Sequence, residues 1–155
     1  MSNEVKPIPD GYQGKITPYL ICKNAEAAIE FYKKAFGATE LFRIGESGKV
    51  GHAELKIGDA IFMMADEFPE IGALSPETVG GTPVSLYVYV ENVDAFTEKA
   101  IAEGLKVLKP VSDQFYGDRS GHFEDPFGHK WGFATHKEDL TPEELDERAK
   151  AAYGG

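Results

Sequence analysis

An internal repeat is the feature that most constrains the fold of this chain. An offset of 68 residues, which carries position 24 onto position 92, brings similar segments into register. The matching pairs are Asn24 with Asn92, Glu26 with Asp94, Ala27 with Ala95, Glu30 with Glu98 and, after a one-residue gap, Gly37 with Gly104. A repeat of this length indicates one supersecondary unit used twice.

Each half of the chain predicts the same order of elements, strand–helix–strand–strand–strand. Asn24 is a plausible helix N-cap, and the glycine at position 37 suits the residue after a helix, where a positive φ is needed. Alternating or apolar runs between turn residues predict the strands. In the first half the strands are expected at 15–22, 39–44, 50–58 and 59–66; in the second they begin at 84 and 105, and two more flank the turn "DPFG".

Residues 67–83 are rich in proline and glycine and lack periodicity, so we expect a linking loop or a lid over a site. A capping box, Thr141 with Glu144, predicts a short helix near the C-terminus. The predicted organisation is an N-terminal extension (1–14), a first βαβββ module (15–66), the loop, a second module (84–136) and an acidic tail with that helix (137–155).

Charge and composition exclude some classes of partner. With 16 basic against 26 acidic residues the formal charge is −10, which argues against nucleic acid and anionic membranes. The single cysteine, Cys22, permits no internal disulfide. No signal-peptide pattern is present, and no apolar run approaches the roughly 18 residues that a membrane span needs. We therefore expect a cytoplasmic protein.

Four stretches of the chain resemble a known family. They are "ITPYLICKNAEAAIEFYKKAFGA", "GHAELKIGDAIFMMADEFPE", "GGTPVSLYVYVENVDAF" and "DQFYGDRSGHFEDPFGHKWGFATHKEDL". Together they are similar to the vicinal oxygen chelate superfamily of glyoxalases, bleomycin resistance proteins and dioxygenases, and within it to the PhnB-like branch. The resemblance implies an α+β fold in which two βαβββ modules form a curved mixed sheet around a cavity, usually in a homodimer.

The resemblance also implies a divalent metal in many members, bound by histidine and glutamate. Matching the family pattern places those ligand positions at Thr17 and Ser85 on the first strands, and at Glu54 and Gly132 on later strands. Only Glu54 is a good ligand, whereas a catalytic zinc-type site usually has three from the protein. We therefore predict no metal and no other cofactor.

Strand parity decides which histidines face the predicted cavity. His52 shares a face with Glu54, and His122 and His136 also have inward parity, while His129 faces away. A relocated metal site built from His52, Glu54 and His122 is an alternative to ordinary polar lining of the cavity.

Other residues are candidates for contact with a ligand. A carboxylate in a partly apolar cavity serves as a general base, so Glu54 is a candidate base and His122 a candidate acid; the alternative is that Glu54 pairs with Lys56 or Arg119. The stretch "YGDR" places Tyr116 and Arg119 at the cavity mouth, unless Arg119 only forms an ion pair with an acidic residue of a second subunit. The expected ligand-binding residues are Thr17, Tyr19, His52, Phe62 (or Met63), Ser85, Tyr87, Tyr116 and Arg119, with Tyr89 of the same parity.

The predicted function is the binding of a small molecule without the family's usual metal, by a homodimer. The alternative is an enzyme: a glyoxalase-like lyase, an isomerase, a dioxygenase or a thiol transferase, using either a metal or Glu54 as general base.

Overall fold

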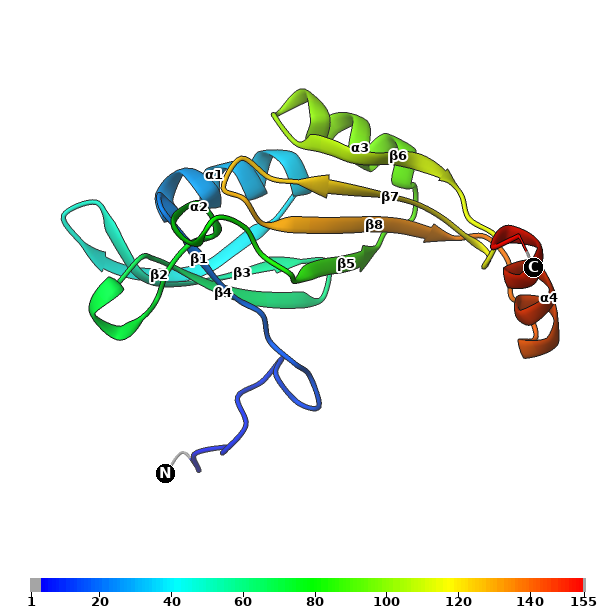
Figure 1. Ribbon diagram of the computed structural model, residues 1–155. Coiled ribbons are helices and arrows are strands. Elements are labelled where there is room, and N and C mark those ends of the chain that lie inside the picture. The colour runs from blue at the N-terminus through cyan, green and yellow to red at the C-terminus, as the bar shows by residue number, and fades with distance from the viewer. Residues whose placement is uncertain (1–3, 155) are drawn as a thin grey trace. The chain divides into compact units, whose positions relative to one another are not determined.

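The computed structural model describes residues 4–154, and the chain divides into two compact units after Val79. Each unit contains one four-stranded sheet with a helix on one face (Figure 1). The fold is therefore α+β, with two mixed sheets, as the sequence predicted.

The first unit has the predicted strand and helix order. Its sheet has the order β1-β4-β3-β2, with β1 parallel to β4 and the other neighbours antiparallel. The elements are β1 (Tyr19–Cys22), α1 (Ala25–Phe36), β2 (Thr39–Glu46), β3 (Lys49–Ile57) and β4 (Ala60–Asp66). The first strand begins later than the predicted residue 15, and two turns precede it, closed by the bonds from Tyr12 N to Pro9 O and from Lys15 N to Tyr12 O.

Helix α1 begins and ends where local signals place it. The Asn24 side chain accepts a bond from the backbone N–H of Ala27, and Gly37 adopts the left-handed conformation at φ 66°. The helix buries Ile29 and Tyr32 against the sheet, and the Tyr32 ring lies 5.6 Å from that of Phe62, centre to centre. Phe62 therefore belongs to the core beneath α1. The prediction that it lines an open cavity is wrong, because Met63 is the residue of β4 that faces the other way.

The second unit repeats the first. Its sheet order, β5-β8-β7-β6, has the same parallel outer pair, β5 with β8. Asn92 accepts a bond from Ala95 N at 3.1 Å, the same length as the Asn24 bond to Ala27 N. This agreement confirms the internal repeat. The elements are β5 (Ser85–Tyr89), α3 (Val93–Ala102), β6 (Lys106–Asp113), β7 (Asp118–Glu124) and β8 (Lys130–His136).

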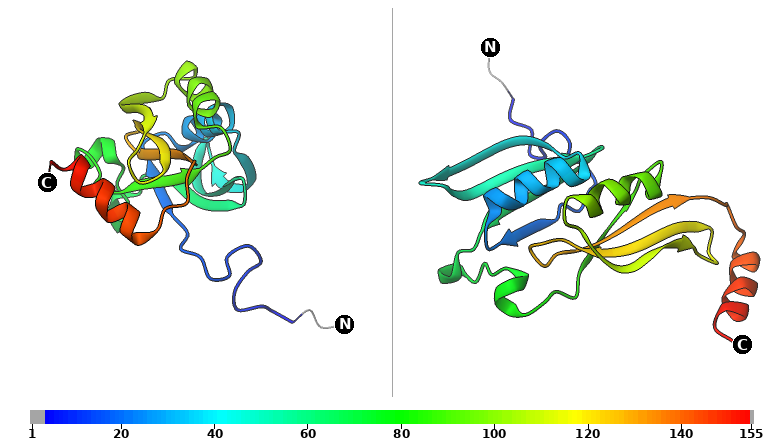
Figure 2. Two further views of the ribbon diagram at one scale, coloured as in Figure 1. Left: turned by 90° about the vertical axis from the view of Figure 1, so that its right-hand side faces the viewer. Right: turned by 90° about the horizontal axis from the view of Figure 1, so that it is seen from above.

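Helix α3 covers one face of this sheet, as Figure 2 shows from above. The Phe96 ring of α3 lies 4.7 Å from the Phe133 ring of β8, and Trp131 stacks on Phe133. Trp131 is buried on this side. Beyond β8 the predicted capping box is present, with Thr141 and Glu144 at the start of α4 (Pro142–Ala152).

The stretch predicted as a loop without structure is ordered in its first part. It contains the 3-10 turn η1 (Pro69–Ile71) and the short helix α2 (Pro76–Val79), and Phe68 forms a β-bridge with Ala73. The Glu67 carboxylate accepts bonds from the backbone N–H of Ser75 at 2.8 Å and from its hydroxyl at 2.6 Å. Within residues 4–154 no helix has the length and apolar character of a membrane span.

Candidate functional site

The first sheet has an open face opposite α1, and four side chains form a row across it. The strand registers place Tyr19, Met63, Glu54 and Phe42 side by side on β1, β4, β3 and β2. His52 lies two residues from Glu54 and shares the face. The predicted candidates Tyr19, His52 and Glu54 are therefore brought together.

Hydrogen bonds link these residues into a chain. The Tyr19 hydroxyl lies 2.8 Å from His52 Nδ1, and His52 Nε2 lies 2.9 Å from Glu54 Oε2. In the tautomer that carries a proton on Nε2, His52 donates to Glu54 and its Nδ1 accepts from the Tyr19 hydroxyl. The other oxygen of Glu54, Oε1, accepts from the Tyr12 hydroxyl.

Tyr12 is a site residue that the sequence did not indicate, because it lies in the predicted N-terminal extension, outside any strand pattern. Burial, followed by its bond to Glu54, raises the pKa of Tyr12 to about 12. Burial and the charge of Glu54 also raise the pKa of Tyr19. Both phenols therefore keep their protons at neutral pH and act as donors.

The structure contradicts the alternative in which Glu54 forms an ion pair with Lys56 or Arg119. The groups bonded to Glu54 are a phenol and an imidazole, and Arg119 pairs with other carboxylates. With only 12% of its side chain exposed, Glu54 is a nearly buried carboxylate held by a phenol and an imidazole. This environment suits either a general base or an acceptor for a ligand's polar group.

A groove of about 1000 Å³ lies beside this row in the first unit. Tyr19 is common to the groove and the hydrogen-bonded chain. The ordered stretch after β4 supplies another wall, with Phe68 and Ile71, and the strands supply Ile21 and Ile44. The groove has the size of a small-molecule site and a largely apolar lining.

The second sheet also has a face opposite its helix, and it carries its own polar cluster. Asp118 is buried and accepts from the Tyr89 hydroxyl at 2.8 Å and from His136 Nδ1 at 2.8 Å, with the Tyr87 hydroxyl at 3.5 Å. Burial raises the pKa of Tyr87 to about 12. Asp118 and Tyr89 thus form a polar cluster on the open face of the second sheet.

The registers of the two sheets show which positions correspond. Tyr87, Gly132 and His122 form one row of the second sheet, as Tyr19, Met63 and Glu54 do in the first. Glu54 therefore corresponds to His122 and not to Gly132. A Cβ on Gly132 would lie 2.6 Å from the Tyr87 ring and 3.4 Å from His122 Nδ1, so these side chains occupy the space above it.

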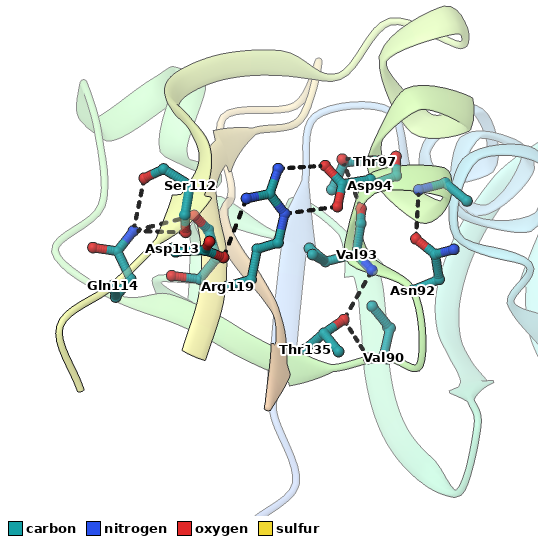
Figure 3. Close-up of polar contacts among 12 residues, drawn as sticks. Val90, Asn92, Val93, Asp94, Thr97, Ser112, Asp113, Gln114, Arg119 and Thr135 are labelled. Atoms are coloured by element: carbon teal, nitrogen blue, oxygen red, sulfur yellow. Dashed lines mark hydrogen bonds and ion pairs between the residues drawn. The ribbon is translucent and has the colours of Figure 1, made fainter. Parts of the chain in front are cut away.

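The position predicted for Arg119 is wrong. Strand β7 already begins at Asp118, so Arg119 points to the opposite face, toward α3 (Figure 3). Its guanidinium donates to both oxygens of Asp94, at 2.7 and 3.0 Å, and to Asp113 at 3.2 Å. Arg119 thus joins β7 to α3 and β6 and does not lie at a cavity mouth.

The remaining candidates lie at the margins of the two open faces. Thr17 precedes β1, and Ser85 is the first residue of β5 and is exposed. Tyr116 lies on the turn before β7, with its ring 5.2 Å from that of Phe115. His129, expected to face away, donates its backbone N–H to Asp125 in the turn before β8.

The donor set of these faces does not match the metal site that the resemblance implies. In residues 4–154 no three side chains of histidine, cysteine, aspartate or glutamate are grouped so as to hold a metal ion. Glu54 and His52 are bonded to each other and to two phenols. Of the other implied positions, Gly132 offers no side chain, and Ser85 and Thr17 offer neutral hydroxyls.

Known proteins resemble this chain in sequence and fold. Uncharacterised proteins of Mycobacterium bovis and Mycobacterium tuberculosis are 37% identical to it over 134 residues, covering 84% of this chain and 88% and 79% of theirs. Among solved structures, TioX from Micromonospora sp. ML1 is 24% identical with a TM-score of 0.64, over 83% of this chain and 100% of that one.

The fosfomycin resistance protein FosX from Listeria monocytogenes has a TM-score of 0.61 at 20% identity, over 86% of this chain and 98% of its own. Residues 14–133 match the family described as Glyoxalase/Bleomycin resistance protein/Dioxygenase superfamily. With that match spanning most of the chain, both modules included, the protein belongs to the glyoxalase/bleomycin resistance protein/dioxygenase superfamily.

Proposed function

We propose that this protein binds a small organic molecule on the open face of its first sheet, without a transition metal. The observation that carries the proposal is the pairing of a groove of about 1000 Å³ with the chain of hydrogen bonds from Tyr19 through His52 to Glu54. The groove supplies burial, and Tyr19, which lines it, connects it to the polar groups of His52 and Glu54.

The donor chemistry supports the absence of a metal from this function. One carboxylate and one imidazole, bonded to each other, hold a divalent ion weakly compared with a three-ligand site. We also place the chain nearest the PhnB-like branch, on the four quoted stretches, and propose a homodimer. The fold shared with a fosfomycin resistance protein is consistent with a small molecule as ligand.

Metal analysis of the protein as purified tests this function. We expect far less than one equivalent of zinc, nickel, manganese or iron per chain. Treatment with a chelator should leave the affinity for an aromatic ligand found by screening unchanged. One metal per chain, lost with a chelator together with ligand binding, would refute the metal-free function.

A metal-free enzyme is the second candidate, and the position of His52 between Tyr19 and Glu54 favours it. An imidazole between a phenol and a carboxylate is suited to proton transfer, with Glu54 as base. If turnover exists, Glu54→Gln should abolish it and spare binding. The control is Glu98→Gln, the same change on the exposed side of α3, which should alter neither.

A further inference from the structure

The segment before β1 lies against the open face of the first sheet. Tyr12 donates its hydroxyl to Glu54, and Gly11 passes so close to β4 that a Cβ on it would lie 2.8 Å from Ile61 Cδ1. Ile61 shares the open face with Met63 and Glu54. The segment thus covers the part of the row where Glu54 lies.

Tyr12 donates a hydrogen bond to one of the two oxygens of the nearly buried Glu54 carboxylate. The other oxygen is bonded to His52, so each oxygen of Glu54 has a partner. A ligand that displaced Tyr12 without a donor of its own would leave that oxygen buried and unpaired, which is costly for a charged acceptor. A ligand that carries a donor replaces the lost bond.

The contact made by Tyr12 therefore indicates which chemical group a ligand must carry. We propose that the open face of the first sheet binds a planar aromatic ligand bearing a ring hydroxyl, and that this hydroxyl displaces Tyr12 from Glu54. Tyr19, Phe42 and Met63 lie in the same row as Glu54 and supply walls for an aromatic ring. This inference rests on the proposed binding function, for which it specifies the ligand class.

Displacement of Tyr12 needs little unfolding. From residue 4 to Pro18 the structure contains no helix or strand, and turns of one bond each flank Tyr12. Segments held by so few contacts open at low cost in free energy. The tyrosine nevertheless competes with a ligand, because its attachment to the chain gives it a high effective concentration at Glu54.

Titrations followed by NMR with two matched probes test the proposal. The probes are 4-ethylphenol and 4-ethyltoluene, in which a methyl group replaces the hydroxyl. Removing the competing donor by Tyr12→Ala should strengthen binding of 4-ethylphenol on the order of tenfold. The reason is that a hydrogen bond to a charged group changes an equilibrium constant by about one to two factors of ten. Tyr12→Phe, which removes only the hydroxyl, should give part of this gain, and neither variant should favour 4-ethyltoluene as much.

Two further variants complete the experiment. Glu54→Gln in the Tyr12→Ala background should reduce the preference for 4-ethylphenol, because the neutral amide is a weaker acceptor. Tyr153→Ala, a change at an exposed tyrosine of the second unit, should leave both affinities unchanged.

The outcomes separate this inference from the proposed function. Equal affinity for the two probes in Tyr12→Ala, or no gain for 4-ethylphenol in either Tyr12 variant, would overturn the ligand class while leaving binding in place. Failure of both probes to bind any of the variants would overturn the inference and the proposed function together.

Discussion

At the scale of single residues, the open face of the second sheet depends on a glycine. Gly132 lies in the row with Tyr87 and His122, and the Tyr87 ring covers it. Larger side chains at this position would push the ring outward. The glycine therefore shapes the second open face, although it contributes no functional group.

Gly132→Ala should destabilise the protein by about 1–3 kcal/mol, because the new methyl group overlaps the Tyr87 ring at 2.6 Å. Thermal or urea unfolding measures the loss. The matched control is Gly51→Ala in β3, where a Cβ meets only the Ile44 carbonyl at an ordinary 3.6 Å. Equal stability of the two variants would contradict the packing described for Tyr87.

His136 makes the stability of the second unit depend on pH. Hydrogen bonds to Asp118, at 2.8 Å, and then to Asp139 raise the pKa of His136. Since the folded state holds the proton more tightly than the unfolded state, this stabilisation is complete below about pH 6.5 and is lost as pH rises through the raised value.

Replacing His136 by glutamine should therefore lower the melting temperature more at about pH 5.5 than at about pH 8.5. Parallel melts of wild type and variant at the two pH values give the comparison. A penalty that is the same at both would show that the charged form of His136 makes no contribution.

At the scale of elements, a single carboxylate organises the stretch after β4. Glu67 accepts from the Ser75 backbone and hydroxyl and from the Thr78 hydroxyl, and these bonds lower its pKa to about 2. Ser75 is fully buried as a result. We therefore expect the part of the predicted lid that lines the groove to be rigid, and the glycines that follow α2 to be more mobile.

Limited proteolysis with a protease of broad specificity should cut wild type first at about residues 80–83, where Gly80 and Gly81 have positive φ. Glu67→Gln weakens the Ser75 bonds and should extend cutting into residues 67–79. Glu77→Gln, a nearby exposed carboxylate with no bond of this kind described, is the control. First cleavage within residues 67–79 of wild type would show that this wall is mobile.

At the scale of the whole molecule, each unit leaves apolar side chains exposed on the sheet face opposite its helix. Ile44 is 61% exposed in the first unit and Tyr89 is 59% exposed in the second. Exposed apolar side chains on a sheet face are typical of contact faces. We expect a second copy of the chain to cover part of it.

Sedimentation at about 50 µM should accordingly give a dimer, since a symmetric pair is the commonest soluble assembly. Ile44→Lys places a charge on this surface and should shift the protein toward monomer. Val5→Lys, at an exposed residue before β1, should not. A wild-type monomer at this concentration would remove the dimer from the proposal.

Two site predictions failed for different physical reasons. The strand "IFMMA" is apolar at every position, so alternation does not indicate which of Phe62 and Met63 faces α1. Arg119 was placed at the cavity mouth, in a stretch that precedes a strand, but β7 already begins at Asp118, and Arg119 therefore faces the opposite side. Both errors concern register, which depends on the neighbouring strands.

The sequence by itself determined the features that depend on near neighbours along the chain. The Asn24 and Asn92 caps, the capping box at Thr141 and the repeated element order all rest on contacts within a few residues, so the pattern of residue types is sufficient to predict them. The matching sheet orders follow from that repetition.

Only the tertiary structure decided how the site is composed. The bond of Tyr12 to Glu54 spans 42 residues, and that of Arg119 to Asp94 spans 25. Such contacts form when packing of distant segments aligns them, and no local preference encodes the partner. The fold can therefore be predicted from short-range signals, while the chemistry of the site depends on long-range contacts within the first sheet and with the segment before β1.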